Sequence, residues 1–310
     1  QAGCIHAMAE INSKCGHTCV ERSHLTSEAH EILGLDHSII EKGIAKLLDR
    51  RKFSEAPNGM VGFYKHVNGE KYIAENILER LRRGQKRQFS EDSLESNYLS
   101  EDQLRALYQA MNSPVFLLTG EAGTGKSTLL KEIINNIQHY AARDAIMLIS
   151  PTGKASKRAS EVTGLFASTI HKALEGVPSP SGGFVFQKNE YNELNADVVI
   201  VDEATMVSVE LWVSLLEAIP FKSKIILVGD INQLPAIQAG KVFEELLSYN
   251  HIPSVRLDKI HRQDTHGLII KNARMINRGL KMILPTAELG NDLYFVGANT
   301  PKAILEICVN

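Results

Sequence analysis

The sequence is poor in the features that mark several classes of protein. Its 310 residues include only four cysteines and one tryptophan, and no apolar stretch approaches the ~20 residues of a membrane span. These shortages exclude a disulfide scaffold, and they predict no association with a membrane. The opening residues, QAGCIHAMAE, lack the charged segment and long apolar core of a signal peptide. They also lack an initiator methionine, which indicates a trimmed or processed chain.

An excess of charge is missing as well. Lys and Arg number 34 and Asp and Glu number 36, which gives a formal net charge of −2. Binding to nucleic acid through an overall basic surface is therefore disfavoured, and any such binding needs a local basic groove. Hydrophobic residues make up 44% and charged residues 23%, as in a water-soluble globular protein of about two domains.

The cysteines allow two interpretations. Cys15 and Cys19 are separated by three residues, with His17 between them and Cys4 upstream, a spacing compatible with zinc. No second pair of ligands follows, because Cys308 stands alone, so buried or free thiols are the favoured interpretation. Without a secretory signal, the reducing cytoplasm is the expected location.

Residues 1–96 are predicted to form a small, mostly helical domain like a winged-helix module. A helical face is followed by two strand-like pieces around Pro57-Asn58-Gly59, which is a hairpin signal. Asn68 is then expected to cap a helix that stops at Gly84. A generic packing domain with the same elements fits the pattern equally well. The apolar helical faces contain Ile40, Ile44, Leu47 and Leu48 in the first helix and Ile73, Ile77, Leu78 and Leu81 in the second.

A basic segment follows at residues 80–87, RLRRGQKR, with five basic residues in eight. It reads either as a solvated helix end with a linker or as a phosphate contact. The polar stretch QFSEDSLESNYLS comes next, and the domain boundary is placed within it, between residues 96 and 97.

From residue 113 onward, short apolar runs alternate with amphipathic helical patterns. The runs are PVFLLTG, AIMLIS, DVVIVDE, KIILVGD and SVRLD. One helix is predicted over 127–138, with Leu130, Ile133, Ile134 and Ile137 facing inward. This alternation predicts an α/β fold with a parallel sheet covered on both faces. Ligands of such sheets bind at the carboxyl ends of the strands.

The strongest chemical signal is GEAGTGKS over 120–127, which matches G-x-x-x-x-G-K-[ST] between a strand and a helix. The glycines let backbone N–H groups turn around phosphates. Lys126 is expected to reach the β- and γ-phosphates and Ser127 to hold Mg²⁺, so ATP and Mg²⁺ are the predicted ligands. The predicted nucleotide-binding residues here are Gly120, Glu121, Ala122, Gly123, Thr124, Gly125, Lys126, Ser127 and Thr128.

Three later motifs supply candidate catalytic groups. Asp202 and Glu203 end an apolar strand, where Asp202 would bind Mg²⁺ and Glu203 would deprotonate the attacking water. Gln233 follows the next strand and is suited to contact a γ-phosphate or its water. Arg262 follows the last strand and is a candidate arginine finger.

Two segments are typical of nucleic-acid contacts. One contains Thr152, Gly153 and Lys154, where a strand end runs into a helix start with hydroxyls and cations. The other contains Thr169 and His171, although His171 also fits a core histidine. The loop-rich residues at about 176–196 follow, and they predict either an inserted β-hairpin or an ordinary surface loop.

Taken in order, these motifs resemble those of superfamily 1 DNA helicases of the RecD/TraA type. The similar segments are LSEDQ, GEAGTGKST, SPTGKASKRASE, STIHKAL, VIVDEATM, GDINQLPAIQAG and LDKIHRQ. The resemblance implies a first RecA-like P-loop motor domain at 97–265, ATP hydrolysis, and 5′→3′ movement along single-stranded DNA. It also implies that Gln103 reads adenine, that Gln233 senses the γ-phosphate, and that the 176–196 segment separates strands at a single-strand/double-strand junction.

The resemblance has one large gap, since the second RecA-like domain of the family is missing. Residues 266–310 are expected to be a connecting helix and the start of a truncated second motor domain, so the chain reads as an internal fragment. The expected activity is that of a monomeric DNA helicase in recombination and repair. Other proteins of those processes are expected partners. The alternatives are an ATP-regulated nucleic-acid-binding module without motor activity and an RNA helicase of the same superfamily.

Overall fold

The computed structural model describes two compact units, Gln1–Asp258 and Lys259–Asn310, which are treated separately here. The described residues are 1–84, 88–90, 93–94, 96, 98–121, 123–180, 182–258, 267–284, 292–294 and 296–309.

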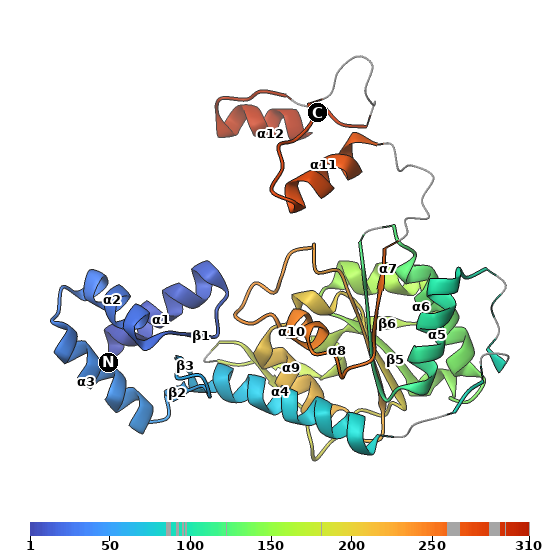
Figure 1. Cartoon of the computed structure of the whole chain (residues 1–310), viewed down its shortest axis with the longest axis horizontal. Helices are drawn as coiled ribbons and strands as arrows, with labels where there is room; N and C mark the ends of the chain where they lie inside the picture. Colours follow the sequence, from blue (N-terminus) through green and yellow to red (C-terminus); the bar gives the residue numbers. More distant parts are fainter. Residues whose placement is uncertain are drawn as a thin grey trace. The chain divides into compact units, whose positions relative to one another are not determined.

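The first 63 residues fold as helices followed by a small antiparallel sheet, with strand order β1-β3-β2 (Figure 1). The sequence of elements, helix–strand–helix–helix–strand–strand, is that of a winged-helix module and confirms the expected small helical domain. Ile40, Ile44 and Leu47 are buried in its core, as their spacing predicts. The elements are α1 (Ala2–Cys15), β1 (Cys19–Val20), α2 (Arg22–Leu33), α3 (His37–Asp49), β2 (Phe53–Glu55) and β3 (Val61–Phe63).

The predicted hairpin turn lies between β2 and β3. The Ala56 N–H donates to the Met60 carbonyl at 2.7 Å, and Gly59 has a φ of 80°. Only glycine adopts such a conformation without strain, which is why this turn contains Gly59. Nearby, the Cys19 thiol donates to the Met60 sulfur at 3.8 Å, and burial raises the pKa of that thiol.

Helix α4 (Tyr64–Arg83) begins earlier than the sequence suggests, so the prediction of Asn68 as its cap is wrong. The chain passes from β3 directly into the helix, and the Asn68 side chain donates to the Tyr64 carbonyl one turn back. The predicted end at Gly84 is confirmed, with its N–H donating to the Arg80 carbonyl at 2.7 Å. At Gly69 a Cβ atom would lie 2.7 Å from Val209, because α4 packs closely against α9 (Val209–Ala218).

The following chain forms a six-stranded sheet in the order β11-β4-β10-β9-β5-β6, with every pair parallel. Five of the strands are the predicted apolar runs. The sixth, β6, has the sequence AST and no apolar run, which is why periodicity does not reveal it. The strands are β4 (Val115–Gly120), β5 (Ile146–Ser150), β6 (Ala167–Thr169), β9 (Val198–Val201), β10 (Lys224–Gly229) and β11 (Ser254–Leu257).

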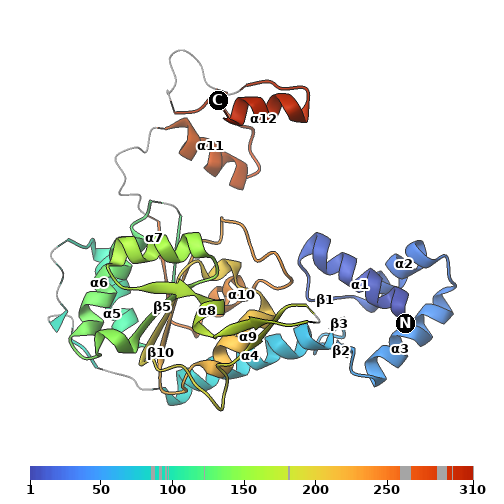
Figure 2. The ribbon, with the colours of Figure 1, turned by 180° about the vertical axis from the view of Figure 1, so that it is seen from behind.

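Helices cover both faces of this sheet, as predicted for an α/β fold (Figures 1 and 2). Val115 and Leu117 point into a core with α4, α9 and α10, whereas Phe116 and Leu118 point into a core with α5, α6 and α7. This alternation follows from the two-residue repeat of a strand. The bounds of these helices are α5 (Glu101–Asn112), α6 (Lys126–Gln138), α7 (Gly153–Thr163) and α10 (Val242–Ser248). The same part of the chain contains the short helix α8 (Ile170–Ala173) and the 3₁₀ turns η2 (Arg143–Ala145) and η3 (Ala204–Met206).

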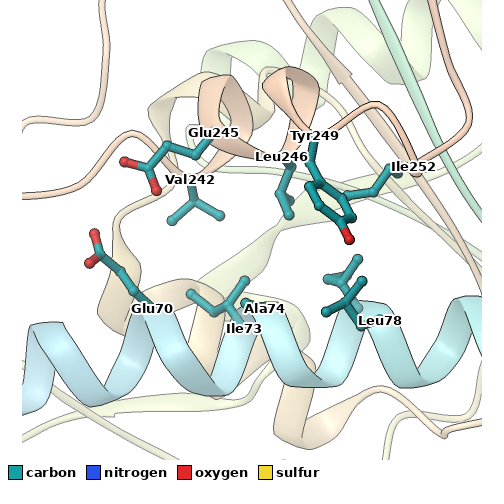
Figure 3. A pocket seen from close by; sticks show the side chains of 10 residues that line it. Glu70, Ile73, Ala74, Leu78, Val242, Glu245, Leu246, Tyr249 and Ile252 are labelled. Atoms are coloured by element: carbon teal, nitrogen blue, oxygen red, sulfur yellow. The ribbon is translucent and has the colours of Figure 1, made fainter. Parts of the chain in front are cut away.

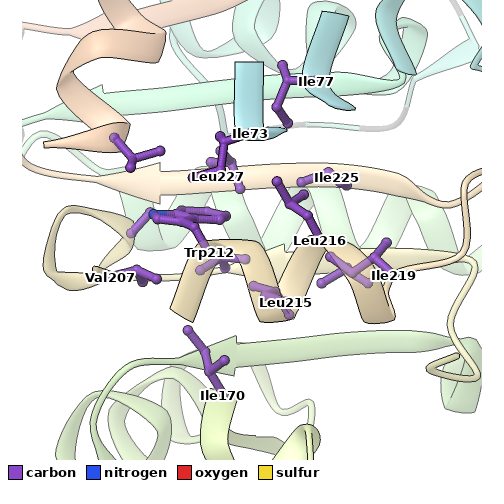
Figure 4. Close-up of a cluster of buried hydrophobic side chains, with 14 of the residues drawn as sticks. Ile73, Ile77, Ile170, Val207, Trp212, Leu215, Leu216, Ile219, Ile225 and Leu227 are labelled. Atoms are coloured by element: carbon purple, nitrogen blue, oxygen red, sulfur yellow. The ribbon is translucent and has the colours of Figure 1, made fainter. Parts of the chain in front are cut away.

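The first core joins helix α4 to the six-stranded sheet. Figure 4 shows Ile73 of α4, Leu227 of β10 and Trp212 of α9 in this core, all almost fully buried. Helix α6 starts at Lys126, one residue before its predicted start, and its predicted inward side chains are all buried in the second core. The predicted hairpin insertion is present as β7 (Gly176–Pro178) paired antiparallel with β8 (Phe184–Phe186).

Arg80 corrects the interpretation of the basic segment. Its side chain is 2% exposed, so it is neither solvated nor a phosphate contact. The guanidinium donates to the carbonyls of Ile219, Pro220 and Phe221, which follow helix α9. Burial lowers the pKa of Arg80 to about 10, so it stays charged at neutral pH. Residues 85–87 of this segment lie outside the described residues.

Replacing Arg80 with Met is expected to lower the free energy of unfolding by about 3 kcal/mol, because three buried carbonyls lose their donor. Urea unfolding measures the change. Arg83→Met is the matched control, since Arg83 is exposed on the same helix end and forms an ion pair with Glu79 of the same helix. Equal losses in the two variants would contradict this account of Arg80.

In the second unit, α11 (Leu268–Asn277) is the predicted connecting helix. The Asn272 side chain exchanges two hydrogen bonds with the backbone of Ile283, each 2.7 Å long. The expected strand of a second motor domain is absent from the described residues of 292–300, whereas a helix, α12 (Pro301–Val309), follows. No helix within the described ranges has the length and apolar character needed to span a membrane.

Candidate nucleotide site and nucleic-acid groove

Three of the predicted nucleotide-binding and catalytic motifs lie at the carboxyl edge of the sheet. Strand β10 lies between β4 and β9, and its register places Gly229 beside Thr119 and Leu227 beside Val201. The loops that follow these three strands carry GEAGTGKS, Asp202-Glu203 and the Asp230–Gln233 segment. The strand ends therefore bring together motifs that are spread over residues 120–233 of the chain.

The loop after β4 has the backbone shape that its glycines predict. Gly123 and Gly125 have φ values of 86° and 89°, a region that residues with a Cβ rarely adopt. At Gly120 a Cβ would lie 2.7 Å from the Leu257 carbonyl and 2.7 Å from the Thr124 hydroxyl. The loop leads into the N-terminus of α6, which favours anions. Ala122, one of the predicted residues, lies outside the described residues.

Lys126 begins helix α6 and turns back over this loop. Its amine donates to the carbonyls of Gly120 and Glu121 and lies 3.7 Å from the Asp230 carboxylate. Burial lowers the pKa of Lys126, while the acids around it, Asp230 first, act to raise it. The amine is thus a partly buried cation held where a phosphate chain on this loop would pass.

The two acids after β9 are held by backbone hydrogen bonds. The Asp202 N–H donates to the Ile149 carbonyl at 2.9 Å, and the Asp202 carboxylate accepts from the Glu203 N–H at 3.0 Å. Burial raises the pKa of both carboxyls, and the charge of Asp202 raises that of Glu203 further. Glu203 has a φ of 54°. A left-handed backbone costs a residue other than glycine about 1–3 kcal/mol, and such strain concentrates at functional sites.

Asp230 is a site residue that the sequence analysis missed. It is 3% exposed, and its carboxylate lies between Lys126 and Gln233, accepting from the Gln233 side-chain amide at 3.3 Å. It also accepts from the Asn232 N–H at 3.1 Å. A buried acid directly after an apolar strand, on the strand next to Asp202-Glu203, is the signal that would have found it.

The surroundings fit a triphosphate with Mg²⁺. The buried hydroxyls of Thr119, Ser150 and Thr205 have no hydrogen-bond partner among the described residues. Thr119 and Ser150 lie in the last two residues of β4 and β5, and Thr205 lies in the turn η3 after β9. Asp202 supplies a hard oxygen ligand of the kind Mg²⁺ prefers, and Ser127, in the first turn of α6, supplies a hydroxyl. These two residues would hold the ion, which would neutralise phosphate charge.

Two predicted nucleotide residues are not joined to this cluster by contacts within the described chain. Gln103 closes the capping box of α5, where its side-chain oxygen accepts from the Ser100 N–H at 3.0 Å. Its reading of adenine stays a prediction. Arg262 lies outside the described residues, so its role as an arginine finger also stays a prediction.

A groove of about 480 Å³ contains two of the predicted nucleic-acid residues, Thr152 and His171. Thr152 caps α7, with its hydroxyl accepting from the Ala155 N–H at 3.2 Å. The other predicted contacts lie close by in the chain, with Gly153 and Lys154 exposed in the first turn of α7 and Thr169 capping α8. Aromatic and apolar side chains that the analysis missed also line the groove: Phe184, Phe186, Met206 and Ile237.

The hairpin contributes an aromatic wall to this groove. The His171 ring lies 4.6 Å from that of Phe184 and 5.7 Å from that of Phe186, so His171 packs on the hairpin instead of inside a core. Phe184 is 50% exposed and Ile237 is 94% exposed. Phe184 and Phe186 share one face of β8 because they are two residues apart, and this spacing is the signal that would have found them.

Phe184→Ala is expected to weaken binding of single-stranded DNA by about 5- to 150-fold, since stacking on one aromatic ring contributes about 1–3 kcal/mol per base. Fluorescence anisotropy with a labelled oligonucleotide measures the affinity. Tyr191→Ala is the matched control, because Tyr191 is 91% exposed in the same insertion but does not line the groove. An unchanged affinity for Phe184→Ala would contradict the stacking role.

An acidic residue that lines the groove is paired with two side chains of helix α4. Glu210 of α9 lies 3.1 Å from the His66 ring nitrogen and 2.6 Å from the Lys65 amine, both on α4. The His66 hydrogen bond and the Lys65 amine lower the pKa of Glu210 to about 2. Its negative charge is thereby paired instead of facing a phosphodiester backbone alone.

Comparison with known proteins agrees with this geometry. A family model described as an AAA domain (AAA_30) matches residues 98–287, which is more than half of the chain. The chain belongs to this AAA domain family. All of the predicted site residues, from Gln103 to Arg262, lie within the matched AAA domain.

Several similar curated proteins are RecD helicases, which confirms the predicted resemblance. The ATP-dependent RecD2 DNA helicase of Deinococcus radiodurans is 36% identical over 181 residues, covering 58% of this chain and 24% of the relative. The RecD subunit of the RecBCD enzyme of Mycolicibacterium smegmatis is 34% identical over 168 residues, covering 47% of this chain and 30% of the relative. The chain thus spans less than a third of the length of these relatives.

A solved structure, the Pif1 helicase of Candida albicans, is also similar. It is 24% identical and has a TM-score of 0.40, with coverage of 59% of this chain and 43% of that one.

Proposed function

We propose that this AAA domain chain is the ATP-binding half of a DNA helicase motor that moves 5′→3′ along single-stranded DNA in recombination and repair. The observation that carries the proposal is the meeting of Lys126, Asp230 and Gln233 at one edge of the sheet, beside the Asp202-Glu203 loop. A cation, an amide and two acids around a glycine-rich loop suit phosphoryl transfer from a nucleoside triphosphate to water. The four free cysteines suit a reducing cytoplasm.

Each group has a proposed task. Lys126 binds the β- and γ-phosphates, and Glu203 accepts the proton of the attacking water. Gln233, held by Asp230, senses the γ-phosphate, and Arg262 stabilises the charge that develops in the transition state. The same Asp230 carboxylate contacts both Lys126 and Gln233. Loss of the γ-phosphate would therefore change the contacts of the loop of residues 230–237.

The loop of residues 230–237 also contributes to the nucleic-acid groove. Ile237, in the same loop as Gln233, lines the groove together with Thr152 and His171. A change at Gln233 is therefore close in the chain to a residue that would contact the strand. This arrangement supports coupling of hydrolysis to grip and release of single-stranded DNA, with the β7–β8 hairpin as the proposed separating element.

Unwinding of two labelled duplexes tests the proposal, using the longest protein that contains these 310 residues. A 5′ overhang is expected to support ATP-driven unwinding and a 3′ overhang is not. Unwinding from the 3′ overhang alone would overturn the polarity. ATP-dependent binding without unwinding would favour the alternative of a regulated binding module, and preference for a matched RNA strand would favour an RNA helicase.

A further inference from the structure

A second cavity lies between α4 and α10, and it is separate from the nucleotide site and the groove. Its volume is about 250 Å³, and it shares no lining residue with the groove. Sites for small molecules are commonly about 300–1,000 Å³. The α4/α10 cleft is therefore closer in size to what one long side chain needs than to a drug-sized ligand.

The walls of the cleft are apolar and firmly held. They are formed by side chains that also belong to the main core of the motor, so their positions are fixed by packing on the sheet. This pre-organisation lowers the ordering cost of binding. The wall residues are Ile73 and Ile77 of α4, Val242 and Leu246 of α10, and Ile252.

One end of the cleft is acidic. Figure 3 shows Glu70 of α4 and Glu245 of α10 facing each other there, with Leu78 and Tyr249 at the other end. Neither carboxylate is in an ion pair with any residue that the structure describes, while the neighbouring Lys241 amine lies 3.7 Å from Glu244. Burial raises the pKa of both cleft acids, and Glu70 raises that of Glu245 further.

Apolar walls that end in two carboxylates select a long aliphatic stem with a cationic head. Phosphate groups are repelled by the acids, which disfavours nucleic acid, and a purely apolar side chain would bring no cation to the two carboxylates. A guanidinium suits the end better than an ammonium, because its planar donors can serve two carboxylates and it is more weakly hydrated. Arginine is also enriched among the anchoring residues of protein interfaces.

We propose that the α4/α10 cleft is a docking site for an arginine side chain of a partner protein, with the stem against Ile73 and Val242 and the guanidinium between Glu70 and Glu245. The site lies where the amino-terminal helix meets the motor core, so a bound partner would contact both parts of the first unit. This proposal does not rest on the helicase activity, because none of its residues belongs to the nucleotide site or the groove.

Methyl NMR of the 310-residue chain tests the proposal with N-acetyl-arginine methylamide as the probe. The methyl signals of Ile73, Ile77 and Ile252 are expected to shift on titration, whereas the citrulline counterpart, which has the same shape without the charge, is expected to leave them in place. Absence of shifts up to the solubility limit of the arginine probe would overturn the proposal. Equal shifts with citrulline would overturn it too, as would shifts of the same methyls by a single-stranded oligonucleotide.

Variants of the chain sharpen this test. The double variant Glu70→Gln/Glu245→Gln is expected to lower the affinity for the arginine probe by at least about tenfold, since hydrogen bonds to charged groups are lost. Glu244→Gln is the matched control on the same helix and is expected to leave the affinity unchanged. Ala74→Trp, which fills the cleft and keeps both acids in the sequence, is expected to abolish the shifts. Full binding in either the double variant or Ala74→Trp would rule out the cleft as the site.

Discussion

Glu203→Gln is expected to keep ATP binding and to lower the rate of hydrolysis by about 10²–10⁴-fold, the usual contribution of a general base. The amide has the shape of the carboxyl group but cannot accept the proton of the attacking water. The left-handed backbone of Glu203 and its N–H bond to Asp202 do not involve the side chain that changes, so the loop is expected to stay in place. Phosphate release in the presence of single-stranded DNA measures hydrolysis, and a fluorescent ATP analogue measures binding.

The same variant is expected to be more stable than the parent at neutral pH. Burial and Asp202 raise the pKa of Glu203, so the folded chain holds this proton more tightly than the unfolded chain. Its contribution to stability is therefore fully present below the unfolded pKa and is lost as the pH rises through the folded pKa. Glutamine has no such loss. Glu161→Gln, on the exposed side of α7, is the control and is expected to alter neither hydrolysis nor stability. Hydrolysis by Glu203→Gln at the parent's rate would show that another group is the base.

Local patterns were enough to predict the sheet and the edge at which the candidate site lies. Apolar β-branched runs found β4, β5, β9, β10 and β11, because buried parallel strands need no alternation of polar residues. The phosphate-loop motif was equally readable, since Gly123 and Gly125 are fixed by backbone conformation alone. What failed depends on tertiary contacts. Strand β6 is formed by pairing with β5 and not by its own composition.

Charged residues were the least predictable, because their surroundings decide their role. Arg80 belongs to a basic run whose pattern predicts a solvated or phosphate-binding side chain, yet it is buried against backbone carbonyls of a segment about 140 residues away. Asp230 was read as part of a motif, and only the placement of β10 between β4 and β9 puts it between Lys126 and Gln233. The sequence shows which residues are charged, whereas the fold determines which groups they contact.

The contacts of Lys126 lead to the other large expected effect. Lys126→Ala is expected to weaken ATP binding by at least about 100-fold, since two charge-assisted hydrogen bonds to phosphates are lost. In the chain itself the amine also lies beside buried Asp230 and acts on the ionisation of Glu203 and Asp202. Its removal takes away a cation that lowers the pKa values of Asp202 and Glu203, so the pKa values of these two carboxyls are expected to rise further.

Two measurements separate loss of the phosphate contact from loss of the fold. Urea unfolding reports whether Lys126→Ala remains folded at the temperature of the binding assay, and calorimetry with ATP and Mg²⁺ reports the affinity. Lys131→Ala is the matched control, because Lys131 is exposed on the same helix. A folded Lys126→Ala chain that binds ATP like the parent would show that the triphosphate does not lie on the β4–α6 loop. That result would also remove the reason for assigning Glu203 and Gln233 to hydrolysis, since both roles depend on a γ-phosphate held beside Lys126.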